Sequence, residues 1–219
     1  MSGGRPATKA ERRWRSLPPD APRDEYFAAL HDVLKEYYLS EPRNPYRQSG
    51  RGSGARRWEE SRRPIAEAVH RDGDFLDVGC ANGLLLESLL EWCAARGHRI
   101  RPHGIDLIPE LVDLARARHP RHASSFETAN AWYWEPRRTY AFVRTELVYV
   151  PARDRAPYVR RLLEKAVAPR GRLIVCAYWG RDERPLSAGH DVRDLGWEPA
   201  GGTEGPGVSV AWLDRHPAP

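Results

Sequence analysis

Cysteine and lysine are scarce in this sequence, and long apolar runs are absent. Its 219 residues include three cysteines, with neither Cys-x-x-Cys spacing nor a pairing pattern, so we expect free thiols in a reducing cytoplasm. No apolar run approaches the roughly 18 residues that a membrane-spanning helix needs. The first six residues lack the apolar segment of a secretory signal. We therefore expect a cytoplasmic protein with no membrane partner.

The scarcity of lysine changes how the positive charge is interpreted. Of 35 basic residues 32 are arginine, which together with abundant alanine, proline and glycine is typical of a GC-rich genome. The formal net charge of +5 lies in residues 1–63, because residues 64–219 carry 21 basic and 21 acidic side chains. A basic arm could bind phosphates or an anionic substrate, and a solvated tail would carry the same charge.

Strand and helix patterns alternate from about residue 75 onward. Short apolar segments predict strands over residues 75–78, 103–106, 125–128, 140–143, 172–177, 197–202 and 208–213. Helical patterns lie between them, over residues 84–96, 109–118 and 155–167. This order predicts an α/β fold with a doubly wound, seven-stranded, mostly parallel sheet and an antiparallel final strand.

The N-terminal third lacks this alternation. Residues 1–21 show no periodicity, so we expect a disordered basic arm there. Apolar residues follow one helical face from residue 24 to 40, and a Gly/Ser-rich loop over 44–54 precedes a helix over 56–70. We expect residues 22–70 to form a helical extension with a possible lid loop, and residues 71–219 to form the core.

The strongest motif joins the first predicted strand to the helix that follows it. Residues 75–83 read Phe-Leu-Asp-Val-Gly-Cys-Ala-Asn-Gly, in which glycines let a ligand approach backbone N–H groups at a helix N-terminus. A dinucleotide fingerprint needs glycine where this chain has Ala81 and Leu84, which disfavours NAD and FAD. Asp77 suits a positively charged ligand instead, and S-adenosylmethionine carries an ammonium and a sulfonium.

This segment resembles the first motif of the class I S-adenosylmethionine-dependent methyltransferases, in which an acid precedes spaced small residues. Asp77, Gly79, Ala81 and Gly83 match it, and the resemblance extends over residues 75–214. It implies a Rossmann-like core and methyl transfer from S-adenosylmethionine, with S-adenosylhomocysteine as product. The cofactor contacts that it implies in this turn come from Asp77, Gly79, Cys80, Ala81, Asn82 and Gly83.

Two further segments match the family's cofactor contacts. Asp106 ends the second predicted strand, where the family has the acid that binds both ribose hydroxyls, and Leu107 follows it. A helix cap is the alternative role for this aspartate. After the third strand, Asn130, Ala131 and Trp132 occupy the adenine-binding region. The Asn130 oxygen can accept from the adenine amine and Trp132 can supply a flat wall, whereas ordinary packing is the alternative for the tryptophan.

Candidate acid–base groups are few. Arg144 and Glu146 follow the fourth strand, where the family's cofactor and acceptor pockets meet; Arg144 is a candidate cofactor contact and Glu146 a candidate base. His190 follows the fifth strand and is a second candidate, unless it is a surface histidine. His119 and His122 have His-x-x-His spacing, but no acidic or cysteine cluster accompanies them, so we expect no metal.

Arg47 adds one candidate from the extension. It lies on the 44–54 loop and could bind the methionine carboxylate of the cofactor if that loop closes as a lid. The same Gly/Ser-rich composition is typical of a linker.

Missing motifs reduce the number of acceptor classes that the sequence allows. The chain lacks the Asp/Asn-Pro-Pro-Tyr/Phe motif of DNA amino-group enzymes and the Pro-Cys nucleophile of cytosine-C5 enzymes. No RNA-binding appendage is visible, while the extension supplies aromatic residues for a pocket. We expect a small-molecule acceptor, in bacterial secondary metabolism, rather than nucleic acid. The alternatives are an RNA methyltransferase that uses the basic arm and a non-catalytic cofactor-binding module.

Overall fold

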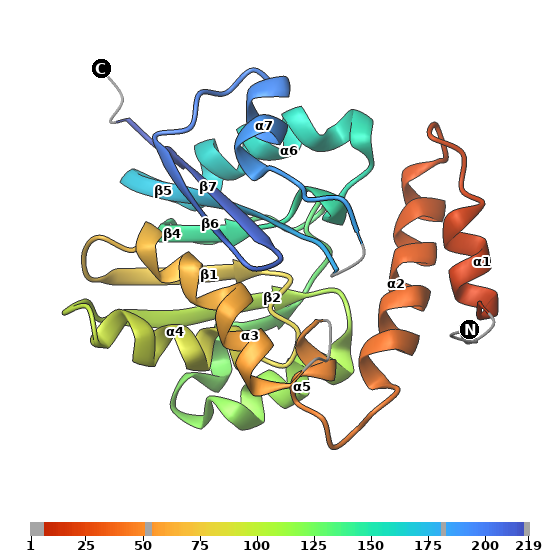
Figure 1. The fold of residues 1–219 in the computed structure, drawn as a ribbon, viewed down its shortest axis with the longest axis horizontal. Helices are drawn as coiled ribbons and strands as arrows, with labels where there is room; N and C mark the ends of the chain where they lie inside the picture. Colours follow the sequence, from red (N-terminus) through yellow and green to blue (C-terminus); the bar gives the residue numbers. More distant parts are fainter. Residues whose placement is uncertain (1–6, 51–53, 181–182, 217–219) are drawn as a thin grey trace.

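The computed structural model describes residues 7–50, 54–180 and 183–216, in which seven strands form one sheet (Figure 1). Their order across the sheet is β3-β2-β1-β4-β5-β7-β6, and only β7 runs against the others. The predicted fold is therefore confirmed. The strands are β1 Gly73–Val78, β2 Ile100–Asp106, β3 Phe126–Thr128, β4 Tyr140–Thr145, β5 Val167–Tyr178, β6 Gly201–Gly205 and β7 Val208–Asp214.

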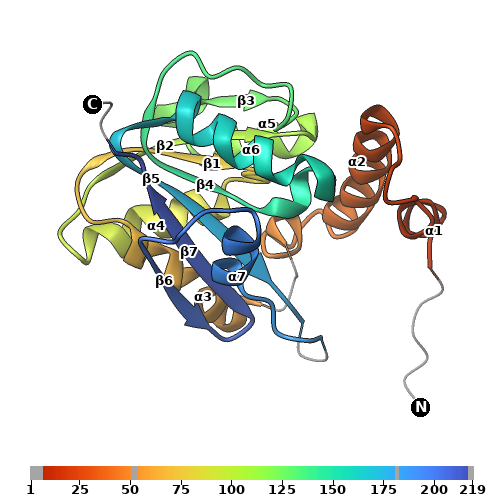
Figure 2. The same cartoon turned by 90° about the horizontal axis from the view of Figure 1, so that it is seen from above.

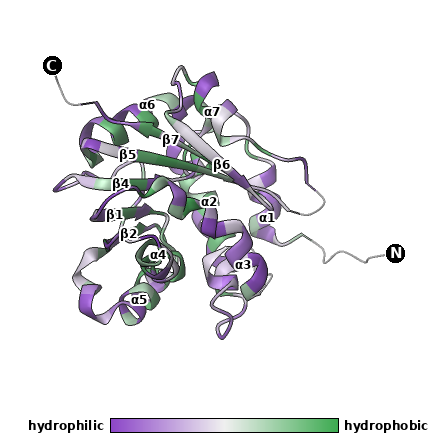
Figure 3. Ribbon diagram, turned by 60° about the vertical axis from the view of Figure 1, so that its left-hand side comes forward, coloured by the Kyte–Doolittle hydropathy of each residue, from purple (hydrophilic) through white to green (hydrophobic). Residues whose placement is uncertain are grey.

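Helices cover both faces of the sheet, so the central strands are buried on each side. Every residue of β4 is buried, which explains its continuous apolar pattern. The helices α3 (Ala55–Arg62), α4 (Leu84–Ala94) and α5 (Pro109–Arg118) share one core cluster with the sheet. The opposite face packs on α6 (Arg155–Arg161) and α7 (Ala188–Asp194). In Figure 3, β5 and α4 are largely hydrophobic whereas α3 is largely hydrophilic.

Two predicted helices end early and continue as tighter or wider turns. The helix predicted over 56–70 stops as α3 at Arg62, and a 3-10 segment that begins at Arg63 follows, with Pro64 in its first turn. The helix predicted over 155–167 passes from α6 into a π-helical turn. The two continuations are η2 (Arg63–Ala68) and the π-helical η6 (Leu162–Ala166). Four further 3-10 segments are η1 Arg47–Ser49, η3 Pro120–Ser125, η4 Leu147–Tyr149 and η5 Ala152–Asp154.

The N-terminal extension is a pair of helices, which corrects the prediction of a disordered arm over 1–21. The helix α1 (Lys9–Arg15) begins with a capping box between Thr8 and Glu11, a local signal that is independent of apolar periodicity. It packs on α2 (Arg23–Leu39), with the rings of Trp14 and Tyr26 5.0 Å apart. Residues 1–6 lie outside the described residues. Figures 1 and 2 both show α1 and α2 standing beside the sheet rather than on either face.

Polar contacts hold α2 against the core. The Arg23 guanidinium donates two hydrogen bonds to the buried carboxylate of Asp154, at 2.9 and 2.7 Å. The Tyr26 hydroxyl donates to the carbonyl of Val148 at 3.0 Å, and the far end of α2 forms an ion pair between Lys35 and Glu110 of α5. Among the described residues, none of the helices has the length and apolarity that a membrane crossing needs.

Candidate functional site

The turn between β1 and α4 depends on backbone conformations that favour glycine. Gly79, Ala81 and Gly83 have φ angles of 81°, 47° and 74°. The alanine is held in this strained region because its N–H donates to Asp106 Oδ2 at 2.8 Å. The Gly83 carbonyl lies 2.9 Å from the Nε2 of buried His119, so this histidine has a structural role.

Asp106 lies at the end of β2, beside this turn. Its carboxylate is 8% exposed; Oδ1 accepts the Ile108 N–H at 2.9 Å, and Oδ2 accepts the Ala81 N–H. Burial raises the pKa of Asp106 to about 6, although these backbone bonds act in the opposite direction. Each carboxylate oxygen retains a second lone pair. The residue therefore caps the turn and can still accept hydrogen bonds from a ligand.

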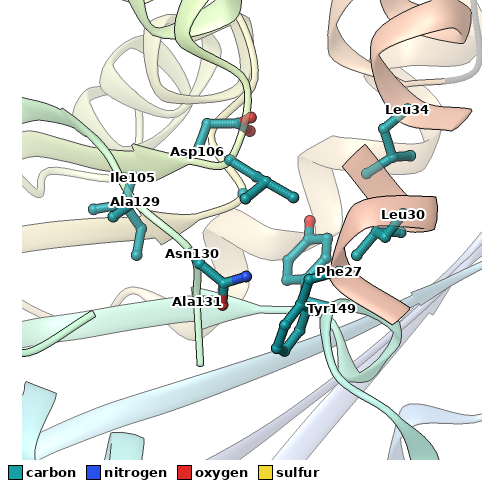
Figure 4. Close-up of a pocket in the computed structure, with 11 residues that line it drawn as sticks. Phe27, Leu30, Leu34, Ile105, Asp106, Ala129, Asn130, Ala131 and Tyr149 are labelled. Carbon is teal, nitrogen blue, oxygen red and sulfur yellow. The ribbon is translucent and has the colours of Figure 1, made fainter. Parts of the chain in front are cut away.

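A narrow pocket of about 40 Å³ lies between Asp106 and the apolar face of α2 (Figure 4). Leu30 and Leu34, one helical turn apart, cover it, and neither was predicted as a site residue. The signal in the sequence that points to them is their i, i+4 spacing on the apolar face of the helix. The pocket is lined by Phe27, Leu30, Leu34, Gly79, Ile105, Asp106, Leu107, Ala129, Asn130, Ala131 and Tyr149.

The segment after β3 meets the predictions only in part. Asn130 lines the narrow pocket, but its side-chain oxygen already accepts the Trp132 N–H at 2.8 Å. Trp132 does not line the pocket; the Arg23 guanidinium lies 4.7 Å from its ring centroid. The structure thus places Trp132 beside Arg23, and residues of α2 line the narrow pocket. Trp134 is buried in the core.

Arg144, at the end of β4, connects the charged groups of the site. Its Nη1 donates to Asp77 Oδ1 at 3.2 Å and to the Tyr149 hydroxyl at 3.1 Å. Its Nη2 donates to Glu146 Oε1 at 2.5 Å and to the Tyr178 hydroxyl at 3.1 Å. Asp77 is thus paired with a guanidinium, and it also lines the large cavity described below. Burial raises the pKa of Asp77 to about 7 even though Arg144 lowers it.

A large cavity of about 820 Å³ adjoins the narrow pocket and shares Gly79 and Tyr149 with it. It lies between the extension and the carboxyl ends of the central strands, and Cys80 and Ala81 line it at the glycine turn. Glu146 also lines it; this side chain is 21% exposed, and the bonds that it accepts all reach Oε1. Among the described residues Oε2 has no hydrogen-bond partner, so Glu146 can accept a proton from a bound molecule.

Three predicted site residues lie elsewhere. The Arg47 guanidinium lies 3.8 Å from the Tyr37 ring centroid and donates to Ser40 Oγ at 3.1 Å; Arg47 lines neither cavity, although Tyr37 lines the large one. Asn82 is fully buried and donates to the Pro45 carbonyl at 2.9 Å, so it fastens the extension to the turn. His190 is exposed and lines neither cavity. Packing of the helices decides all three positions.

Comparisons with known proteins establish the fold. No protein-family model and no curated protein matches the sequence. A Burkholderia thailandensis 1,6-didemethyltoxoflavin-N1-methyltransferase, solved with 1,6-didemethyltoxoflavin and S-adenosylhomocysteine, is 16% identical, with TM-score 0.62 over 92% of this chain and 93% of that one. The DhpI–S-adenosylhomocysteine complex is 18% identical, with TM-score 0.59 over 86% and 99%. A methyltransferase of Aquifex aeolicus is 17% identical, with TM-score 0.54 over 74% and 94%. The chain has the fold of the class I S-adenosylmethionine-dependent methyltransferases.

Proposed function

We propose that this protein is an S-adenosylmethionine-dependent methyltransferase that acts on a small molecule, in bacterial secondary metabolism. The observation that carries the proposal is the large cavity of about 820 Å³ beside the glycine turn. Small-molecule sites measure roughly 300–1,000 Å³. The Burkholderia neighbour, which binds 1,6-didemethyltoxoflavin, supports a small acceptor. The described cysteines are all buried and free, as expected in the cytoplasm that we propose as its location.

The residues at the turn fit the cofactor. Asp106 would accept hydrogen bonds from the ribose hydroxyls through its remaining lone pairs, and Leu107, Asn130 and Ala131 would contact the adenine. Leu30 of α2 would cover the nucleoside from the other side. A volume of about 40 Å³ holds only about three waters. The nucleoside would therefore bind with α2 shifted outward from the position that it has in this structure.

Arg62 replaces Arg47 as the group that would bind the methionine carboxylate. Its guanidinium lines the large cavity, 3.7 Å from the Tyr178 ring centroid and 4.9 Å from that of Trp58. The helix α3 that carries it packs beside α4, with Trp58 Nε1 3.3 Å from Ser88 Oγ. When a guanidinium stacks on an aromatic ring, the N–H groups at its edge remain free to donate hydrogen bonds to a carboxylate.

The reaction requires little chemistry from the protein. The cofactor supplies a methyl group already activated by the sulfonium, and a lone pair of the acceptor displaces the sulfur. The extension excludes water and aligns the acceptor. Glu146, through Oε2, would take a proton from an acceptor that must lose one.

The test is direct. Calorimetry with S-adenosylhomocysteine, followed by S-adenosylhomocysteine formation from S-adenosylmethionine over a panel of small acceptors, should give micromolar binding and turnover. Tight binding without turnover on any acceptor would favour a non-catalytic module. Submicromolar RNA affinity that falls steeply with salt would favour an RNA methyltransferase.

A further inference from the structure

The charged side chains that line the large cavity are not balanced. Arg144 is bonded to both Asp77 and Glu146, so one guanidinium serves two carboxylates. The other charged groups that line the cavity are Arg57, Arg62, Arg155 and Asp191. None of these three arginines forms an ion pair with a described residue. Four guanidiniums against three carboxylates leave one surplus positive charge.

A bound cofactor increases this surplus. S-adenosylmethionine brings a carboxylate, an ammonium and a sulfonium, which together add one more positive charge. One arginine, Arg62 in our proposal, is matched by the carboxylate, and the surplus of the filled site becomes two. Net charge that is removed from water without a counter-charge is costly. The acceptor that displaces the remaining water is therefore favoured if it is an anion.

Arg155 is the group best placed to bind that anion. It begins α6, on the sheet face opposite to α3 and Arg62. The acceptor's anionic group would therefore not compete with the cofactor's carboxylate for one guanidinium. Its Nε donates to the Leu147 carbonyl at 3.2 Å, which fixes the side chain. Its two terminal nitrogens have no hydrogen-bond partner among the described residues, and a fixed guanidinium binds carboxylates through such a pair.

The walls of the large cavity favour a flat molecule. Aromatic rings from both the extension and the core line it: Trp14, Tyr37, Tyr38, Trp58, Tyr149 and Tyr178. Val148 and Leu186, exposed by 49% and 47%, extend the apolar lining to the surface. Planar aromatic ligands bury large area against such rings.

We infer that the methyl acceptor is a planar aromatic anion, of the aromatic carboxylate class, whose charged group binds Arg155. This inference rests on the proposed function and names its class of substrate.

Binding of two matched probes tests it. The probes are 2-naphthoate and 2-naphthamide, which share a ring system and differ in charge, titrated by calorimetry into the full chain saturated with S-adenosylhomocysteine. We expect 2-naphthoate to bind at least about 10-fold more tightly. Arg155→Gln should remove most of that preference and leave S-adenosylhomocysteine affinity within about 2-fold. Arg160→Gln, on an exposed position of the same helix, should leave the preference intact.

The outcomes separate the inference from the function. Equal affinity of the wild-type protein for both probes would overturn the anionic acceptor, and this measurement needs no variant. A preference that survives in folded Arg155→Gln, verified by its melting temperature, would overturn the assignment of Arg155. If S-adenosylhomocysteine does not bind but the protein without it prefers 2-naphthoate to 2-naphthamide, the proposed function fails while the anion site stands.

Discussion

Tyr149 lies directly over Gly79, and the tyrosine ring occupies the space that any side chain at position 79 would need. A Cβ built on Gly79 would lie 2.5 Å from the Tyr149 hydroxyl oxygen. That hydroxyl is also bonded to Arg144 and Glu146, so the ring cannot move without breaking the charged network. The close approach ties the glycine turn to the segment after β4.

Gly79→Ala should therefore be strongly destabilising. The left-handed φ of 81° alone costs about 1–2 kcal/mol for alanine, and the overlap with Tyr149 adds to it. Gly97→Ala is the matched control, because Gly97 has φ of 83° and nothing within 4 Å of the added Cβ. Urea unfolding should show the larger loss at position 79, and Tyr149→Ala should recover part of it. Equal losses at both glycines would contradict the contact.

Asp106→Ala should weaken S-adenosylhomocysteine binding by about 1–3 kcal/mol, because the ribose hydroxyls and two backbone N–H groups lose their acceptor. Asp106→Asn, which keeps one carbonyl oxygen, should lose less. Calorimetry measures both. Asp113→Ala, whose side chain is 73% exposed, is the control and should bind as the wild type does. Unchanged affinity in Asp106→Ala would remove this residue from the cofactor site.

Arg62→Gln should weaken S-adenosylhomocysteine binding about 10-fold, or about 1.4 kcal/mol, whereas Arg47→Gln should leave it unchanged. The difference follows from their positions, since Arg62 lines the large cavity and Arg47 does not. The two variants remove the same charge from neighbouring parts of the extension, so each controls for the other. The reverse pattern would restore the sequence-based assignment of Arg47.

Asp77 should make the free energy of unfolding decrease as the pH rises. Burial raises the pKa of its carboxyl from 3.8 to about 7, so between these values the folded state binds more protons than the unfolded state. The contribution of Asp77 to the free energy of unfolding is thus complete below about pH 4 and is lost as the pH rises to about 7. The slope is up to about 1.4 kcal/mol per pH unit.

Urea titrations of the wild type and Asp77→Asn at successive pH values measure this contribution. The wild type should lose stability relative to Asp77→Asn as the pH rises through that window. Asp113→Asn, on an exposed helical position, should follow the wild type at every pH. Parallel curves for the wild type and Asp77→Asn would show that Arg144 keeps the carboxylate ionised throughout.

The core could be predicted from the sequence because its signals are local. A buried strand such as β4 is a continuous apolar run, and the glycine turn is a short motif whose spacing reports backbone conformation. The last strand pair was found as well, although β6 begins at Gly201 rather than at the predicted residue 197. The position of Asp106 at the end of a strand was predictable because it follows from the local pattern.

Contacts between distant segments could not be predicted in this way. Trp132 is covered by Arg23, more than 100 positions earlier in the chain, and it does not line the narrow pocket. Which of several arginines faces the cavity depends on how α2 and α3 pack, so composition alone could not separate Arg62 from Arg47. The capping box of Thr8 and Glu11, in contrast, is a local signal that was overlooked.

The helix α2 has one further consequence, for the kinetics of the whole cycle. Leu30 and Leu34 line both the narrow pocket and the large cavity, so in the proposed function a single helix would cover both ligands. Whichever ligand binds first meets the free-energy cost of positioning this helix, and the second then binds a protein that is already ordered. Cofactor and acceptor should accordingly bind with positive cooperativity, and the two products should leave through one shared opening step rather than independently.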